Sequence, residues 1–314
     1  MTALVLLNSG AGSANKMAAR VEKAFAGCGV GVTVRQLSGS EVGAAARDFV
    51  AGTTAKPPRS GAPQSNSEIL VVAGGDGTIG AAVAAVAGSD IPLGILPLGT
   101  LNHFARDLGL PLDLDKAVAV VAEGFVRRVD VVELNGRLFV NNSSVGLYPF
   151  MVAQRDAEQK RTGRSKFLAT LPAALRALLG ASWHRLDIVA AGERKSVRTP
   201  CLFIGNNPYE TGLASFGTRK ALDRGELSIH VVRQQTRLGI LLLPFRIALG
   251  LVDPSRDVET FSAADLEVNS RRRHLRVSLD GEIATLQTPL RYRSRPKALC
   301  VFAPRAPTTP SAAT

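Results

Sequence analysis

Residues 70–80 read LVVAGGDGTIG, where an apolar run ends at two glycines that are followed by an aspartate, a glycine and a threonine. The run EILVVA (68–73) predicts a buried strand, and IGAAVAAVAG (79–88) predicts a helix of small residues. Glycines between a strand and a helix allow a sharp turn, and the N-terminus of a helix attracts phosphate. Asp76 would repel a bare phosphate, so we expect a Mg²⁺ ion or a hydroxyl group between them. Thr78 offers a hydroxyl group to a phosphate or as a helix N-cap. Taken alone, the turn also fits an ordinary connection between a strand and a helix.

Two similar turns follow other predicted strands in the first part of the chain. The strand IPLGILP (91–97) runs into LGTLN (98–102), where a glycine leaves room for a ligand and polar residues stand at a helix start. The strand ALVLL (3–7) is followed by NSGAGS (8–13). The carboxyl ends of parallel strands meet at one edge of an open α/β sheet. We therefore expect the three turns to converge on a nucleotide.

The texture of the sequence changes near residue 127. Before it, apolar strands alternate with helical patterns, which predicts a parallel sheet covered by helices on both faces. After it, VDVVELNGRLFVNN (129–142) has the signature of a hairpin around Asn-Gly, and most later segments read as strands, with helices expected at 155–180 and 236–251. The predicted fold class is α/β with two domains. The N-terminal domain is a nucleotide-binding domain with a parallel sheet, and the C-terminal domain resembles an antiparallel β-sandwich.

Composition limits the partners. The chain carries a formal net charge of +12, and its three cysteines and four histidines are scattered, which predicts neither a disulfide framework nor a zinc site. The charge favours an anionic partner. Aromatic residues make up only 5% of the chain and do not alternate with basic ones, which argues against nucleic acid. No signal peptide or membrane-spanning apolar run is evident, so we expect a cytoplasmic protein.

The ordered motifs resemble those of the bacterial diacylglycerol kinase-like lipid kinases, which share a catalytic domain with sphingosine kinases and are distant relatives of NAD kinase. GGDGT (74–78) matches the family pattern fully, and NSGAGS is similar to its Asn-Pro-x-Ser-Gly start, with Ser9 in place of the proline. The resemblance covers nearly the whole chain. The other similar segments are LPLGTLNHFARDLGLP (96–111), VDVVELNGRLFVNNSSVGL (129–147), LFIGNNPYETG (202–212) and SLDGE (278–282).

The resemblance implies an α/β domain that binds ATP and a β-rich domain that binds lipid, with the active site between them. It implies that the last strand, ALCVFA (298–303), returns to the first domain. The expected boundaries are 1–127 with 292–304, then 128–291, then a disordered tail at 305–314. The resemblance also implies ATP and Mg²⁺ as cofactors, and transfer of the γ-phosphoryl group to the hydroxyl of diacylglycerol or a related long-chain lipid. The residues expected to bind ATP are Asn8, Gly12, Gly74, Gly75, Gly77, Thr78, Pro97, Gly99, Thr100 and Asn102.

Three acids are the expected catalytic residues. Phosphoryl transfer depends on positioning and charge neutralisation, and we expect Asp76 to help hold the catalytic Mg²⁺ or to orient the attacking hydroxyl. By resemblance, Glu282 in SLDGE is the first choice for the base that accepts the hydroxyl proton, and Asp280 is the second. Without the resemblance, SLDGE would read as an ordinary acidic turn.

A second metal site is expected from the resemblance, but the sequence departs from the pattern there. Some family members hold a Mg²⁺ with acids from a segment that aligns with LDRGELSI (222–229). Asp223 is kept, whereas Arg224 and Ser228 stand where acids are common. Arg224 is an alternative source of fixed positive charge, and Asp130 matches another acid linked to this site. The expected metal ligands in the chain are Asp76, Asp130 and Asp223.

The expected partners are a lipid substrate and an anionic membrane surface. The basic segment 155–176 predicts weak, transient binding at the inner face of the membrane, because anionic headgroups attract basic residues. A homodimer is left open. Two other functions also remain open: a kinase of a soluble substrate, as in NAD kinase, which also carries GGDGT, and a regulatory protein that kept the nucleotide cleft but lost turnover.

Overall fold

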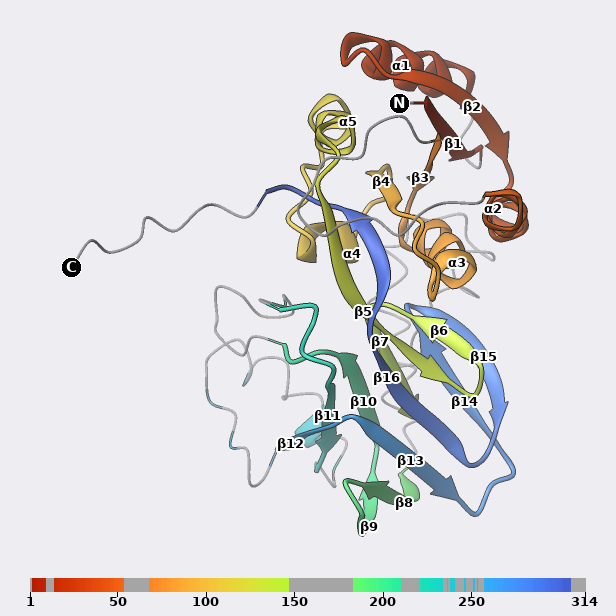
Figure 1. Ribbon diagram of the computed structural model, residues 1–314. Helices are drawn as coiled ribbons and strands as arrows, with labels where there is room; N and C mark the ends of the chain where they lie inside the picture. The colour runs from red at the N-terminus through yellow and green to blue at the C-terminus, as the bar shows by residue number, and fades with distance from the viewer. Residues whose placement is uncertain are drawn as a thin grey trace, which may run out of the picture. The chain divides into compact units, whose positions relative to one another are not determined.

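The computed structural model describes residues 2–9, 14–53, 68–146, 183–209, 221–233 and 257–305, together with a few single positions. The chain divides into two compact units (Figure 1). Unit 1 consists of residues 1–129 and 298–314, and unit 2 of residues 130–297. The loop expected at 53–67 (except Thr53), the helix expected at 155–180 and most of the helix expected at 236–251 lie outside the described residues.

Unit 1 contains a parallel sheet, as the alternation of strands and helices predicted. Its strand order is β2-β1-β3-β4-β16, and β16 joins it in parallel through Val301 opposite Leu93. The helices α1 and α5 pack beside each other, as do α2 and α3 (Figure 1). The strands are β1 (Thr2–Asn8), β2 (Gly31–Leu37), β3 (Glu68–Gly74), β4 (Leu93–Pro97) and β16 (Leu290–Phe302), and the helices are α1 (Ala14–Gly27), α2 (Gly39–Gly52), α3 (Asp76–Val86), α4 (His103–Asp107) and α5 (Leu114–Glu123).

The core of unit 1 explains why its strands are continuous apolar runs. Six of the seven residues of β3 are buried, because helices cover both faces of a parallel sheet. One face packs against Val21 and Phe25 of α1 and against Val118 and Val121 of α5. These positions recur at helical spacing, which is how the sequence predicted the helices.

Unit 2 is an antiparallel β-sandwich, as its sequence predicted. One sheet has the strand order β12-β11-β10-β7-β14-β15. In the other sheet, the first part of β16 pairs with β13, which pairs with β8, which pairs with β9. Their inward side chains form one apolar core. The strands are β5 (Val126–Leu134), β6 (Arg137–Phe139), β7 (Asn142–Gly146), β8 (His184–Ala190), β9 (Glu193–Thr199), β10 (Cys201–Asn206), β11 (Leu227–Val232), β12 (Val258–Ala263), β13 (Asp265–Ser270), β14 (His274–Leu279) and β15 (Glu282–Gln287).

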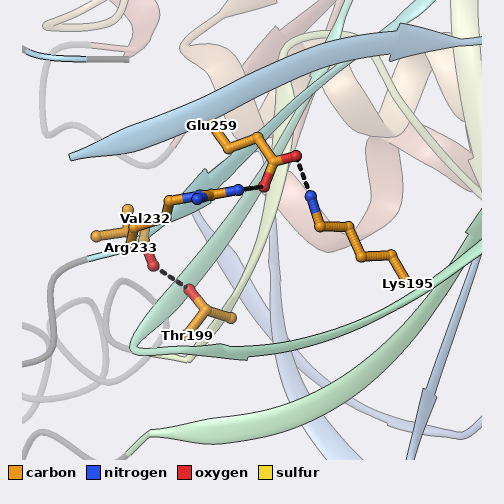
Figure 2. A network of polar contacts seen from close by, with 5 residues as sticks. All are labelled: Lys195, Thr199, Val232, Arg233 and Glu259. Carbon is orange, nitrogen blue, oxygen red and sulfur yellow. Dashed lines mark hydrogen bonds and ion pairs between the residues drawn. The ribbon is translucent and has the colours of Figure 1, made fainter. Parts of the chain in front are cut away.

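A polar network joins the two sheets of unit 2 (Figure 2). The carboxylate of Glu259 on β12 accepts hydrogen bonds from Lys195 on β9 and from Arg233, whose Nη2 lies 2.6 Å away. The hydroxyl of Thr199 donates to the carbonyl of Val232 at 2.7 Å. Strand β9 of one sheet is therefore tied to β11 and β12 of the other by charged and neutral hydrogen bonds.

The last strand begins before its continuous apolar segment. The apolar segment ALCVFA (298–303) marks only its end, whereas β16 begins at Leu290 and has 13 residues. Buried Leu290 and Tyr292 alternate with exposed Arg291 and Arg293 in its first half. This alternation is itself a strand pattern, with one face in the core and one in solvent.

Candidate functional site

The end of β1 and the turns after β3 and β4 come together within unit 1. Asn8 at the end of β1 donates from Nδ2 to the hydroxyl oxygen of Thr78, 2.7 Å away, in the first turn of α3. The backbone N–H of Leu98, after β4, donates to the carbonyl of Gly74 at 2.9 Å. Direct hydrogen bonds therefore join the end of β1 and the turns after β3 and β4, whereas residues 10–13 of the first predicted turn lie outside the described residues.

Two glycines allow the turns after β3 and β4 to touch. A Cβ atom added to Gly99 would lie 2.5 Å from the Cα of Gly75 and 2.7 Å from Oδ1 of Asn102. A Cβ atom added to Gly74 would lie 2.7 Å from the side chain of Thr78. Neither contact is compatible with a side chain larger than hydrogen. Glycine is thus required at Gly74 and Gly99 by the close packing of the turns.

Asn102 fixes the turn after β4. Asn102 is buried, and its φ of 52° lies in the left-handed region, which asparagine tolerates better than most residues. Oδ1 accepts from the N–H of Gly99 at 2.9 Å, and Nδ2 donates to the carbonyl of Gly99 at 2.8 Å. We expected Asn102 to bind nucleotide. In the structure, its side-chain amide forms hydrogen bonds with the backbone of the turn.

Helix α3 begins earlier than the sequence suggested. It starts at Asp76 with Gly75 as its N-cap, so the last three residues of GGDGT form its first turn. Thr78 is therefore not the N-cap, and its hydroxyl oxygen accepts the hydrogen bond from Asn8. The first N–H groups of a helix have no partner within the helix. They carry the partial positive charge that stabilises anions at this end.

Asp76 carries an unsatisfied carboxylate oxygen. Its Oδ1 is buried and has no hydrogen-bond partner. A buried, unpartnered carboxylate oxygen is costly, and such groups are normally found where an ion or a donor satisfies them. The donor set fits a divalent cation such as Mg²⁺, which prefers oxygen ligands and usually takes one or two carboxylates together with phosphate oxygens.

The other predicted nucleotide ligands surround this turn. Gly77 and Thr100 are exposed, and Pro97 is buried at the end of β4. Gly12 lies outside the described residues.

The predicted bases lie in unit 2, on either side of the β14–β15 turn. The carboxylate of Asp280 accepts hydrogen bonds from the backbone N–H groups of Val140, Asn141 and Asn142, at 2.9, 2.8 and 3.0 Å. Burial raises the pKa of Asp280, and these three hydrogen bonds and the nearby guanidinium of Arg219 oppose the rise. Both carboxylate oxygens are thus used to hold the segment 140–142.

Glu282 differs from Asp280 in its surroundings. It is the first residue of β15, it is exposed, and it lies opposite Leu279 in the β14–β15 pair. An exposed carboxylate can reach a substrate without breaking structural hydrogen bonds. Glu282 is therefore the more accessible of the two carboxylates, and the choice between them as the base stays a prediction.

Of the two predicted ligands of the second metal, Asp130 is held by backbone groups. Asp130 is fully buried, and its two carboxylate oxygens accept from the N–H of Lys297 at 2.7 Å and of Gly225 at 2.6 Å. Asp223 and Arg224 are exposed. Among the described residues, no three histidine, cysteine or acidic side chains form a group that could hold a metal ion. The metal-binding roles of Asp76, Asp130 and Asp223 stay predictions.

Sequence reasoning missed a buried polar cluster next to Asp280. Arg219 donates to the carbonyls of Val140 and Asn206 at 2.7 and 2.8 Å, and to Oδ1 of Asn141 at 3.0 Å. It therefore binds the same segment that holds Asp280. The Asn-Asn pairs in FVNNSS and IGNNP were the available signal, because adjacent amides in predicted strands are unusual in an apolar core.

Comparisons with known proteins place this arrangement in a class. Two solved structures from Bacillus anthracis str. Sterne, one of them described as a diacylglycerol kinase, have TM-scores of 0.71 and 0.68 at 22% and 18% identity. Each comparison covers 96% of this chain and 97% of the other. At these identities the likeness shows the fold. The class is thus a two-unit protein with the fold of these structures, built from a parallel α/β unit and an antiparallel sandwich.

Sequence relatives identify the family. The diacylglycerol kinase catalytic domain matches residues 2–134. A diacylglycerol kinase of Staphylococcus saprophyticus is 38% identical over 111 residues, which cover 35% of this chain and only 36% of that protein. A protein of Pseudomonas syringae pv. tomato, named "Probable lipid kinase YegS-like", is 32% identical over 253 residues, 75% of each chain. The chain belongs to the lipid kinase family that carries the diacylglycerol kinase catalytic domain.

No helix within the described residues is long and apolar enough to span a membrane.

Proposed function

We propose that the protein is an ATP- and Mg²⁺-dependent lipid kinase, which transfers the γ-phosphoryl group of ATP to the hydroxyl of diacylglycerol or a related long-chain lipid. The observation that carries this proposal is the junction of the end of β1 with the turns after β3 and β4. There Asn8 donates a hydrogen bond to Thr78, Gly75 contacts Gly99, and the unsatisfied carboxylate of Asp76 lies at the start of α3. Family membership supports a kinase rather than another nucleotide-binding protein.

Each part of the junction has a role in holding ATP. The free N–H groups in the first turn of α3 favour the polyphosphate chain. Gly75 and Gly99 bring backbone groups close to the ligand, and Asn102 keeps the second turn in one conformation. Preorganised donors of this kind lower the barrier because they need no rearrangement when charge develops.

Asp76 is the residue of unit 1 that would hold a Mg²⁺ ion. When bound, the ion neutralises negative charge on the phosphate oxygens. The carboxylate lies in the first turn of α3, beside the N–H groups that favour the phosphates.

Glu282 is the proposed base in unit 2. Its exposed carboxylate is free to accept the proton of an acceptor hydroxyl. The change Glu282→Gln keeps the size of the side chain and removes this basicity, so we expect turnover to fall while the fold is kept. A normal kcat in the folded variant would remove Glu282 from the role.

One assay separates the proposal from its rivals. Purified protein is incubated with labelled ATP and Mg²⁺, with diacylglycerol and other long-chain alcohols in mixed micelles, and with NAD in a parallel sample. We expect label in a lipid, and none in the Asp76→Asn variant. Label only in NAD would indicate a kinase of a soluble substrate, and nucleotide binding without any labelled product would indicate a regulatory protein.

The lipid substrate makes an association with membranes part of this proposal. A diacylglycerol remains in the bilayer, so the kinase must work at its surface, and we propose transient binding to an anionic membrane. The segment 155–176, from which the sequence predicted this binding, lies outside the described residues. Unit 2 offers a second basic surface that the structure does describe.

A further inference from the structure

A row of arginines crosses three neighbouring strands at one end of unit 2. Arg185 on β8 lies directly opposite Arg198 on β9. On the other side of β8, Leu186 pairs with Ser270, the last residue of β13, so the register places Arg271 beside Arg185. All three side chains lie on the solvent face, because their neighbours Leu186 and Val197 pack in the core.

This arrangement places two positive charges directly opposite each other. Like charges directly opposite each other in an antiparallel pair repel, and natural strands usually place an opposite charge or a neutral residue there. The neighbouring strands of the same sheet do so: Arg291, Arg293 and Arg295 on β16 are paired with Glu267, Asp265 and Glu133. Arg185, Arg271, Arg272 and Arg273 form no such ion pair with any acid in the described ranges.

The turn between β13 and β14 extends the row. Arg271, Arg272 and Arg273 are exposed, and the backbone of the turn is fixed by the hydroxyl of Thr288, which donates to the carbonyl of Arg272 at 2.9 Å. Arg272 lies close enough to His184 to help lower its pKa, after the larger effect of burial. The nearest acid by register is Asp187, two residues along β8 from Arg185, and its carboxylate accepts a hydrogen bond from Ser196.

Trp183, the only tryptophan of the chain, stands at the edge of this basic surface. The guanidinium of Arg198 lies 5.9 Å from the centre of its ring. Tryptophan is enriched at the boundary between a membrane and water, where an apolar ring and a polar N–H are both satisfied. A basic surface with one tryptophan and no row of aromatic side chains fits a lipid headgroup layer better than nucleic acid bases, which stack on several aromatic rings.

We infer that the surface formed by Trp183, Arg185, Arg198 and Arg271–Arg273, here called the arginine end, docks unit 2 onto an anionic phospholipid bilayer. The inference deepens the proposed function, because it names the surface through which a lipid kinase reaches its substrate. Phosphate headgroups would supply the opposite charge that Arg185 and Arg271–Arg273 do not find among the described residues. The docking is therefore expected to weaken as salt rises, because exposed charges are screened.

The test is vesicle sedimentation without ATP, at about 50 mM and about 300 mM salt. One set of vesicles contains about 30% phosphatidylglycerol in phosphatidylcholine, and the other is phosphatidylcholine alone. We expect binding to the first set only, and mainly at low salt. Each arginine near an anionic surface contributes about a fivefold gain in partitioning. The variant Arg271→Gln/Arg272→Gln/Arg273→Gln should therefore bind at least about tenfold more weakly.

The chain offers a control with the same change in net charge. The variant Arg291→Gln/Arg293→Gln/Arg295→Gln also loses three positive charges, but from arginines that are paired with acids. We expect it to keep most of the binding. Equal weakening of both variants would show that net charge alone drives the binding, and would overturn the inference. Unchanged binding of the first variant would also overturn it, as would tight binding of a nucleic acid duplex without binding to vesicles.

Failure of the docking and failure of the kinase proposal give different results. A short-chain diacylglycerol that dissolves in water supplies an acceptor without a bilayer. If the kinase proposal holds, the arginine-end variant phosphorylates this acceptor at the normal rate, whatever its vesicle binding. If no lipid is ever phosphorylated but the vesicle results are as expected, the docking surface stands and the kinase proposal falls.

Discussion

At the scale of single residues, Asp76 separates function from stability. Its Oδ1 is buried and unpartnered, so the carboxylate adds little to the fold beyond the helix N-terminal effect of about 0.3–1 kcal/mol. The change Asp76→Asn keeps the shape and removes the charge. We expect the unfolding free energy to change by less than about 1 kcal/mol, and kinase activity to fall by about 100-fold or more. Urea unfolding and a kinase assay on the same preparation check both. Normal turnover would exclude Asp76 from the site.

Two glycines of the same region should respond in opposite ways to alanine. In Gly99→Ala, the new Cβ would lie 2.5 Å from the Cα of Gly75, so the junction of turns must shift, at a cost of about 1–3 kcal/mol. In Gly80→Ala, within α3, no atom lies within 4 Å of the new Cβ. That change should stabilise the protein by about 0.5–1 kcal/mol, because alanine is the better helix former. Thermal melts of both variants test the assignment of close packing to Gly99.

His230 predicts a loss of stability in mild acid. Burial lowers its pKa to about 4, and Nε2 and Nδ1 are hydrogen-bonded to the hydroxyls of Ser228 and Thr260 at 2.8 and 3.0 Å. The unfolded chain takes up a proton near pH 6.5, whereas the folded chain resists until about pH 4. The stability due to His230 is therefore complete above pH 6.5 and is lost as the pH falls toward 4, by up to roughly 3 kcal/mol.

The contribution of His230 can be isolated by substitution. His184 has a pKa shifted in the same direction, so the wild-type curve contains both residues. In His230→Gln, the fall in unfolding free energy between pH 7 and pH 4.5 should be smaller than in the wild type. An unchanged slope would mean that His230 is not buried in the neutral form.

At the scale of secondary-structure elements, the Glu259 network of Figure 2 should contribute modestly to the free energy of unfolding, and only above acid pH. Burial tends to raise the pKa of Glu259, but the hydrogen bonds from Lys195 and Arg233 outweigh it and lower the pKa below 4.5. Its contribution is thus present above pH 4.5 and is lost below it. Because Lys195 and Arg233 are 48% and 40% exposed, we expect Glu259→Gln to cost about 1 kcal/mol at pH 7. Urea unfolding at pH 7 and pH 3.5 should show this difference and then its decrease.

The helices and strands also show which parts of the fold could be predicted from the sequence. Strands β3 and β4 and the turns after them were predictable, because continuous apolar runs followed by glycine have few other structures. The early start of α3 was not predictable, because its first three residues, Asp76, Gly77 and Thr78, are poor helix formers. The hydrogen bonds that fix the carboxylates of Asp130 and Asp280 could not be predicted from the sequence either. Their partners are backbone N–H groups of Gly225, Lys297 and residues 140–142, and no sequence pattern reveals such contacts.

At the scale of the whole molecule, unit 1 depends on residues from the far end of the chain. Leu299, Val301 and Phe302 of β16 are fully buried, and β16 joins the sheet beside β4. Burying a large apolar side chain contributes about 1.5–3 kcal/mol, so three of them provide a large part of the roughly 5–15 kcal/mol by which a domain is stable. A chain that ends at Lys297 should therefore have an unfolded or rapidly digested unit 1.

A matched truncation controls for the loss of the tail itself. A chain that ends at Arg305 keeps all of β16 and removes only residues 306–314. We expect its melting temperature and nucleotide binding to match those of the full chain, whereas the chain that ends at Lys297 loses nucleotide binding and yields early proteolytic cuts within residues 1–129. If the shorter chain still bound nucleotide with normal affinity, β16 would be dispensable for unit 1, and the buried strand would have to be replaced by other residues.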